Sequence, residues 1–400
     1  MKTSIEKHPL VTIVMTTYNA EKHIDESLKS ALAQDIIDIE IVCVDGHSTD
    51  NTVNIIHEYA KKDARIRLIY QDRAGIGAAK NCGIENAKGE YITFLDADDF
   101  YVDKTALRKM YHVCKKEHVS VCGAFRSTLF MDGYIEKEPL HRNDCNDKVG
   151  YVRLRYIDRP YDYHFHSYLY ERGMIQNSNA RFAEVKAYDD THFFIRAMLL
   201  AKEFCVVPVE LYRYRCGPAY DWDMEKANDA ILSLIDQLRI SKENNLAILH
   251  WLTTQRINYE YGNIFEKNVL NGDMELLDSL IVANKEVDSE MIAVVENNPP
   301  EDWYLEPMMH RRVSDMPLRS ADTCYSPRFV LEPLWKIMHP EQRPVPQNDG
   351  LAQQEENIIV IHKSFLLRKI HGGIRCLKEN GIGYTVRRVM KKVKSHIERY

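Results

Sequence analysis

The sequence predicts an α/β protein with a mostly parallel, doubly wound sheet and a helical C-terminal extension. Short apolar runs alternate with amphipathic stretches over residues 10–95, as in parallel strands joined by right-handed crossovers. Two of these runs end directly in a carboxylate, at Asp45 and Asp96. Beyond residue 218, apolar side chains recur mainly at helical spacing, which indicates packed helices.

The composition indicates a globular protein with more than one structural unit. The chain has 400 residues, of which 45% are hydrophobic and 28% charged, too many for one small core. Residues 1–8 lack the apolar core of a signal peptide, and no apolar run reaches the roughly 18 to 20 residues that span a bilayer. Nine Cys without a Cys-x-x-Cys pair favour reduced thiols. We therefore expect a cytoplasmic protein.

The expected elements follow one another closely along the chain. Apolar, β-prone runs predict strands, and recurring apolar residues three or four apart predict the helices between them. Residues 130–165 show little periodicity and are predicted to be loops. Strands are expected at 10–15, 39–44, 66–70, 91–95, 119–125 and 206–214, and helices at 24–32, 53–60, 75–87, 103–113 and 189–201.

Acidic residues gather where the fourth strand is expected to end. Asp96, Asp98 and Asp99 lie within four positions. Parallel strands end at one edge of a sheet, where open α/β folds bind ligands, so Asp45 should lie near them. Mg²⁺ or Mn²⁺ would relieve the repulsion between such carboxylates and commonly bridges them to phosphates. An Asp after a strand is also an ordinary helix cap, and the pattern alone leaves both interpretations open.

Three other binding motifs are excluded. An EF-hand loop starting at Asp96 would have Tyr101 in place of its Gly and Leu107 in place of its Glu. The segment 75–80 has Lys80 where a dinucleotide fingerprint needs Gly or Ala, and it follows the third strand rather than the first. No Walker lysine loop occurs either.

The order of the motifs resembles that of the family 2 glycosyltransferases, which have a GT-A fold. The family's opening motifs are matched at 11–19 and 44–52, and its later block at 79–83 and 89–99. This resemblance implies a nucleotide-diphosphate sugar donor, with a UDP-sugar as the first candidate. It implies contacts to the base from Thr16 and Tyr18, to the nucleoside from Asp45, to the ribose from Asp96, and to a Mg²⁺- or Mn²⁺-bound diphosphate from Asp96 and Asp98.

Two positions depart from the family pattern. Gly46 stands where many relatives carry a second Asp, so recognition of the base is open. Lys80 replaces the commoner Arg, which keeps a cation but loses the planar fork that grips phosphate. Arg73, just upstream, is the alternative source of that fork.

A second acidic pair, Asp189 and Asp190, is expected in the first turn of a helix. Acidic residues at this place often only complement the helix dipole. The resemblance implies instead that the pair supplies the base of an inverting transfer. Asp190 is then expected to take the proton of the acceptor hydroxyl, and Asp189 to orient it or to bind the acceptor.

The C-terminal part carries a distinct charge. From Lys363 onward, 11 Lys and Arg face 2 Asp and Glu, a local +9. Residues 384–400 form a basic amphipathic pattern that can lie on anionic lipid, cap the protein or join copies of the chain. The predicted plan is a catalytic domain at 1–218, a helical extension at 219–342, a linker at 343–362 and basic helices at 363–400.

These observations predict a metal-dependent, inverting glycosyltransferase that acts without a nucleic-acid partner. It would move one sugar to a glycan or lipid-linked acceptor in bacterial surface polysaccharide synthesis, in the cytoplasm or at the inner face of the membrane. Residues 255–259 do not fit the Gln-x-x-Arg-Trp motif of processive members. The alternatives are a sugar-phosphate nucleotidyltransferase, whose Gly-rich, Arg-bearing loop is missing from 16–23, and a non-catalytic glycan-binding protein.

Overall fold

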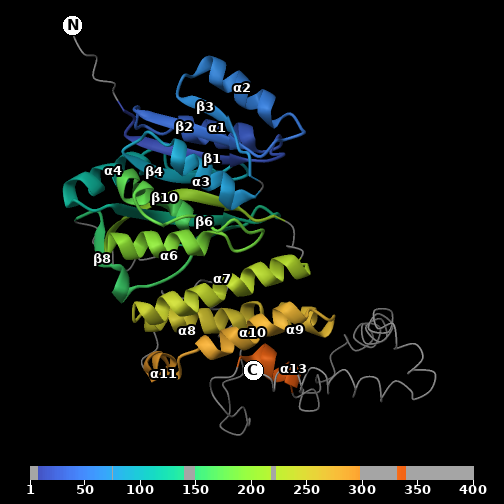
Figure 1. Cartoon of the computed structure of the whole chain (residues 1–400). Helices are drawn as coiled ribbons and strands as arrows, with labels where there is room; N and C mark the ends of the chain where they lie inside the picture. Colours follow the sequence, from blue (N-terminus) through green and yellow to red (C-terminus); the bar gives the residue numbers. More distant parts are fainter. Residues whose placement is uncertain (1–7, 74, 139–148, 218–221, 298–330, 339–400) are drawn as a thin grey trace. The chain divides into compact units, whose positions relative to one another are not determined.

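The computed structural model describes residues 8–73, 75–138, 149–217, 222–297 and 331–338 (Figure 1). These residues form two compact units. The first contains all the strands, and the second begins at Trp222 and is helical. The predicted linker at 343–362 and the basic residues 363–400 lie outside the described residues. The domain boundaries remain predictions.

The first unit is built on one sheet whose central strands are parallel. Its order is β3-β2-β1-β4-β9-β6-β10-β5, with β7 beside β6 and β8 beside β10. The first four strands pair in parallel, as do β6 and β10, and the short strands pair antiparallel. The predicted fold class is therefore confirmed. The strands are β1 Val11–Thr17, β2 Ile39–Asp45, β3 Ile66–Tyr70, β4 Tyr91–Asp96, β5 Phe100–Tyr101, β6 Val121–Leu129, β7 Ile135–Glu138, β8 Val152–Arg155, β9 Tyr168–Glu171 and β10 Glu203–Arg215.

Helices cover both faces of this sheet because successive strand residues point to opposite sides. Ile13 and Met15 of β1 belong to a core with apolar residues of α1 (Ile24–Leu32), α2 (Thr52–Lys62) and α4 (Ala106–Glu117). Val14 faces the other way, toward α3 (Ile76–Asn86), where a Cβ on Gly83 would come within 2.2 Å of Val14 Cγ1. Phe193 of α6 (Asp190–Ala201) packs edge-on against Phe94 of β4. Among the described residues of this unit, the other α-helix is α5, Arg172–Gln176.

The prediction of loops throughout 130–165 was wrong in part. The structure contains β7, β8 and the 3₁₀ turn η2 (Tyr156–Asp158) in this segment. Val152 and Leu154 alternate with exposed Arg153 and Arg155 in β8, so the strand has the period of a half-buried edge. It is short and pairs with β10, about fifty residues away. Its four residues are too few to stand out as a periodic pattern.

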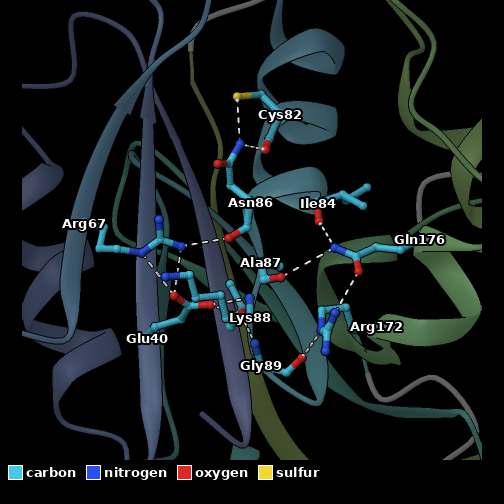
Figure 2. Close-up of polar contacts among 11 residues, drawn as sticks. Glu40, Arg67, Cys82, Ile84, Asn86, Ala87, Lys88, Gly89, Arg172 and Gln176 are labelled. Atoms are coloured by element: carbon cyan, nitrogen blue, oxygen red, sulfur yellow. Dashed lines mark hydrogen bonds and ion pairs between the residues drawn. The ribbon is translucent and has the colours of Figure 1, made fainter. Parts of the chain in front are cut away.

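A polar network fixes the amino edge of the sheet, at the opposite end of β2 from Asp45 (Figure 2). Glu40 is 6% exposed and accepts hydrogen bonds from Thr12 Oγ1 at 2.6 Å and from the Lys88 amide at 2.6 Å. Arg67 donates to Glu40 at 3.0 Å and to the Asn86 carbonyl at 2.7 Å. The buried charge is thus paired and hydrogen-bonded, as burial requires, and the network fixes the turn from α3 into β4.

The second unit packs its helices around a leucine-rich core. Asp223 and Asp273 cap α7 and α10 by accepting hydrogen bonds from the amides of Lys226 and Leu276. The predicted helical extension is present in the described part of this unit. No described helix combines the length and apolar character needed to cross a bilayer. The elements are α7 Met224–Glu243, α8 Ala247–Gln255, the π-helical turn η4 Arg256–Glu260, α9 Gly262–Leu270, α10 Met274–Glu286, α11 Ser289–Asn297 and α13 Glu332–Met338.

Candidate active site

Asp45 and Asp96 end the two strands that flank β1. The register pairs Thr17 with Asp45 on one side and Thr16 with Asp96 on the other. Successive side chains of a strand point to opposite faces of the sheet, so each Thr hydroxyl meets the carboxylate that is in register with it on its own face. Thr17 donates to Asp45 at 2.9 Å and Thr16 donates to Asp96 at 3.0 Å. The two predicted donor-site carboxylates therefore lie at one edge of the sheet, as the strand order requires.

Asp45 is fully buried and held by the turn that follows β2. Besides the bond from Thr17, it accepts hydrogen bonds from the Ser48 amide at 2.8 Å and from the Ser48 hydroxyl at 2.6 Å. Asn19 ties the neighbouring loop to this turn, because its side-chain oxygen accepts from the Thr49 amide at 2.8 Å. The loop at 17–19 and the turn at 48–50 thus form one connected surface beside Asp45.

The three carboxylates at the end of β4, Asp96, Asp98 and Asp99, have different surroundings. Asp99 is buried and accepts from the Tyr212 hydroxyl and the Arg215 amide, both at 2.6 Å. Burial and the charges of Asp98 and Asp96 raise the pKa of Asp99 to about 8. Asp98 reaches solvent, yet partial withdrawal from water and the charge of Asp96 raise its pKa as well. Asp99 is therefore engaged within the protein, whereas Asp98 is open to a ligand.

The carboxylates of Asp96 and Asp98 fit a hard divalent cation that also binds a substrate. Asp96 and Asp98 repel each other and would both gain from a nearby positive charge, which is the environment that Mg²⁺ and Mn²⁺ favour. Within the described residues, no group of three or more His, Cys, Asp or Glu is arranged to hold a metal ion. An ion at this place would therefore need oxygen ligands from a bound diphosphate or from water.

Lys80 of α3 lies beside the second acidic pair and away from solvent. Its side chain is 3% exposed, and its Nζ is 3.2 Å from Asp189 Oδ2. The ammonium also lies 4.5 Å from the ring centroid of Phe165 and 5.1 Å from that of Phe182. Burial lowers the pKa of Lys80, but the opposing charges of Asp189, Asp96 and Asp190 outweigh it and leave the pKa raised. Lys80 is therefore a buried cation in the field of both acidic groups.

Helix α3 places the segment that leads into α6. Asn81 accepts from the Phe182 amide and donates to the Phe182 carbonyl, each at 2.9 Å. A Cβ on Gly77 would lie 2.0 Å from the Ala183 carbonyl oxygen, so glycine permits this close approach. The Ala183 amide in turn donates to the Asp189 carbonyl at 3.0 Å. The sequence motif at 79–83 thus positions a segment one hundred residues further along the chain.

Asp190 is the first residue of α6, and Asp189 is its N-cap. Burial and the adjacent Asp189 raise the pKa of Asp190 to about 7, against the opposing effect of Lys80. A carboxylate with a pKa near neutrality suits general-base chemistry. Tyr188 just before the pair has φ 66°, a left-handed conformation that costs a bulky residue energy and that clusters at functional sites.

Two predicted contacts have exposed positions. Tyr18 is 65% exposed, so its ring is available to a ligand. Arg73 is exposed and forms an ion pair with Glu184 at 2.6 Å, which joins the start of α3 to the segment before Asp189. The structure therefore places Thr16, Asp45, Asp96 and Asp98 at the same edge of the sheet. Lys80, Asp189 and Asp190 form a second group, and Lys80 links it electrostatically to Asp96.

The sequence did not predict that Tyr212 and Arg215 contact the loop that contains Asp98 and Asp99. Besides the bonds to Asp99, Arg215 Nε donates to the Asp98 carbonyl at 2.8 Å and Nη2 pairs with Glu26 of α1 at 2.6 Å. The end of β10 thus fixes the shape of the loop after β4. The Tyr-x-Tyr-Arg pattern at 212–215 was the available signal, but the sequence does not show which loop the strand end meets.

The first part of the chain matches a known family. A family model described as glycosyl transferase family 2 matches residues 12–200. The chain is 30% identical over 196 residues to an uncharacterized glycosyltransferase of Haemophilus influenzae, with 49% of this chain and 74% of the relative covered. It is also 30% identical over 219 residues to the uncharacterized glycosyltransferase EpsJ of Bacillus subtilis, with 52% of this chain and 62% of the relative covered. The chain thus spans about three fifths of the length of EpsJ.

A solved structure shares the fold. S. aureus TarS 1–349 in complex with UDP-GlcNAc superposes with a TM-score of 0.59 and 21% sequence identity, covering 71% of this chain and 83% of that chain. At this identity the likeness concerns the fold alone, and it agrees with the GT-A fold that the sequence predicts.

Proposed function

Because the chain belongs to glycosyl transferase family 2, we propose that it is an inverting glycosyltransferase that transfers one sugar per reaction from a nucleotide-diphosphate donor. The observation that carries this proposal is the placement of two acidic groups around Lys80. One group, Asp96 with Asp98, ends a parallel strand where such folds bind ligands. The other, Asp189 with Asp190, begins a helix and contains a carboxylate with a raised pKa.

In the proposed reaction, the Asp190 carboxylate accepts the proton of the acceptor hydroxyl as that oxygen attacks the anomeric carbon of the donor. Attack comes from the side opposite the diphosphate. The bond from the anomeric carbon to the diphosphate oxygen breaks, and its electron pair leaves with the nucleoside diphosphate. The products are the glycosylated acceptor with inverted configuration, the nucleoside diphosphate and the proton held by Asp190.

The donor is proposed to lie along the ends of β1, β2 and β4. Tyr18 and Thr16 would contact the base side, and Asp45 the nucleoside. Asp96 and Asp98 would hold Mg²⁺ or Mn²⁺, which when bound neutralises negative charge on the departing diphosphate. A UDP-sugar is the first candidate donor, supported by the UDP-GlcNAc bound to the TarS structure.

The acceptor is proposed to be a glycan or a lipid-linked saccharide. Relatives of the first part of the chain include a poly(ribitol-phosphate) beta-glucosyltransferase and a putative teichuronic acid biosynthesis glycosyltransferase, both from Bacillus. These names support a role in the assembly of a bacterial surface polymer. The family of the chain argues against the two alternatives, a nucleotidyltransferase and a non-catalytic protein, but only turnover excludes the second.

A donor screen tests the proposal. Thermal unfolding of the full chain would be followed with UDP-GlcNAc, UDP-glucose, UDP-galactose and GDP-mannose, each with Mn²⁺, with Mg²⁺ and with EDTA. Release of nucleoside diphosphate by hydrolysis of the same donors would be measured in parallel. We expect one donor class to raise the unfolding temperature in the presence of metal, since a ligand stabilises the state that binds it, and to be hydrolysed slowly. A chain that neither binds nor hydrolyses any of these donors would contradict the proposal.

A further inference from the structure

We propose that Lys80 is a positioning residue for the catalytic pair, and not a phosphate-binding cation as its sequence motif suggests. Its ammonium holds Asp189 and keeps a positive charge beside Asp190 while the donor occupies the neighbouring strand ends. This inference rests on the proposed function. It assigns to a residue of α3 the task of keeping the base of α6 ready to accept a proton.

The position of the side chain argues against direct contact with a phosphate. Lys80 is 3% exposed, its Nζ lies over the rings of Phe165 and Phe182, and it forms an ion pair with Asp189 at 3.2 Å. A lysine that grips phosphate must present its ammonium to the ligand. Here the two aromatic faces, which attract a cation, hold the ammonium within the protein and toward α6.

A purely structural role also explains the arrangement poorly. Moving a lysine and a carboxylate out of water costs about as much as their attraction returns, so replacing a buried pair with apolar groups is often neutral. The chain nevertheless encloses this charge between two acidic groups. Asn81, the next residue of the same helix, ties α3 to the segment before Asp189 through two hydrogen bonds to Phe182. The fold therefore does not need the charge of Lys80 to join these elements.

The electrostatic consequence can be worked out from the groups that face Asp190. Asp189 and Asp162 raise its pKa, and Lys80 lowers it. Tyr170 lies within the field of Asp190, and His166 within that of Lys80. Removing the ammonium leaves the two neighbouring carboxylates unopposed. Asp190 then holds its proton to higher pH, and a smaller fraction of it is available as a base at neutral pH.

The test compares Lys80→Met, Lys80→Arg and Asp189→Asn by the pH profile of kcat for hydrolysis of UDP-GlcNAc, or of the donor that the screen selects. For Lys80→Met we expect the acidic limb of the pH profile of kcat to move to higher pH by about one unit. At pH 7 this lowers the deprotonated fraction of Asp190, and with it kcat, by roughly five- to tenfold. The donor Kd should stay within about threefold. Lys80→Arg keeps the charge and should restore most of the rate. Asp189→Asn removes a negative neighbour of Asp190 and should move the acidic limb of the pH profile to lower pH.

Arg67→Met provides the matched control. It removes a partly buried cation that pairs with Glu40 at the other edge of the sheet (Figure 2). It should lower the unfolding temperature and leave the acidic limb in place. If Lys80→Met does not fold, as judged by circular dichroism, the other two variants decide the question: the acidic limb should stay in place in Lys80→Arg and move to lower pH in Asp189→Asn.

The outcomes separate the inference from the proposed function. If the wild-type chain neither binds nor hydrolyses a donor, the proposed function fails and the inference fails with it. If the wild type is active and the acidic limb stays in place in both Lys80→Met and Asp189→Asn, the inference alone is overturned. A Lys80→Met variant that keeps kcat but raises the donor Kd at least tenfold would also overturn it, in favour of phosphate binding.

Discussion

At the scale of single residues, the proposed chemistry depends most on the ionisation of Asp190. Its pKa is raised to about 7 by burial and by Asp189, so near neutrality the carboxyl is divided between its two forms. Only the deprotonated form accepts a proton, and the rate of transfer should therefore rise with pH through about 7. The same carboxyl in water would be ionised throughout this range, and the rate would then show no such rise.

Replacing Asp190 with Asn tests this role. We expect kcat to fall by roughly 10²- to 10⁴-fold, the usual contribution of a general base, and the rise of the rate near pH 7 to disappear. Donor binding should be retained, because Asp96 and Asp98 are unchanged. Initial rates and a donor titration between pH 5.5 and 8.5 would measure both quantities. Asp158→Asn is the control, since Asp158 lies at the surface and pairs with Arg155; a similar loss there would indicate a general effect of removing charge.

Whether the position of a site residue could be predicted depends on how far away in the sequence its partner lies. Asp45 and Asp96 were predictable because parallel strands must end at one edge, and the residues after each strand are visible in the sequence. Lys80 and Asp189 are 109 residues apart in the sequence, and no hydrophobic periodicity predicts that they pair. The family motif identified both residues but suggested a different partner for Lys80. Direct contacts between distant segments depend on how helices pack, which the local pattern does not contain.

At the scale of elements, the turn from α3 into β4 illustrates how closely the backbone is packed. A Cβ on Gly89 would lie 2.4 Å from the backbone nitrogen of Thr12 and 2.7 Å from the carbonyl carbon of Val11. The Gly89 amide also donates to Thr12 Oγ1 at 2.8 Å, and its carbonyl accepts from Arg172 at 2.6 Å (Figure 2). The family block at 89–99 therefore begins with a glycine for a structural reason, the close approach of β1.

Replacing Gly89 with Ala should lower the free energy of unfolding of the first unit by about 1 to 3 kcal/mol, the usual cost of overpacking. The nearest atoms belong to the backbone of β1 and have little room to move. Urea unfolding followed by circular dichroism would measure the change. Gly173→Ala is the matched control, because a Cβ at Gly173 meets nothing within 4 Å. Equal unfolding midpoints for the two variants would contradict the argument.

The regular elements could be predicted because each carries its own periodicity. Strand β3 and the alternation of strands and helices up to β4 follow from apolar patterns of five or more residues. Strand β9, Tyr168–Glu171, was not predicted. Its four residues lie in an aromatic-rich stretch and pair antiparallel with β4 and β6. The stability of such a strand comes from its neighbours rather than from its own sequence, and so the order of the sheet beyond β4 required the structure.

At the scale of the whole molecule, the Trp residues distinguish the strands from the helices of the second unit. The four Trp are at positions 222, 251, 303 and 335, so none lies in β1–β10. Trp222, Trp251 and Trp335 belong to the second unit, and position 303 lies outside the described residues. Intrinsic Trp fluorescence therefore reports mainly on the second unit. Donor binding is proposed at the strand ends of the first unit. If the two units unfold independently, a donor should leave the unfolding transition seen by Trp fluorescence nearly unchanged.

The second unit should lose stability in mild acid because of His250, which is fully buried in α8. The Asp288 amide donates to His250 Nε2 at 2.8 Å, so Nε2 carries no proton. Nδ1 must then carry it and donate to Ser241 Oγ, also 2.8 Å away. Burial lowers the pKa of His250 from 6.5 to about 4. Protonation of Nε2 would replace the bond from the Asp288 amide with a repulsive contact.

The pKa of His250 is lower in the folded state than in the unfolded state. The stability that neutral His250 contributes is therefore fully present above pH 6.5 and is lost as the pH falls toward 4. The loss should reach on the order of 2 to 3 kcal/mol. Urea unfolding monitored by Trp fluorescence at several pH values would measure it. His250→Gln should be less stable than wild type at pH 7, yet should have a smaller dependence on pH between 6.5 and 4. His57 lies on the exposed side of α2, and His57→Gln should keep the full dependence of the unfolding free energy on pH. If His250→Gln also keeps it, another group causes the loss of stability.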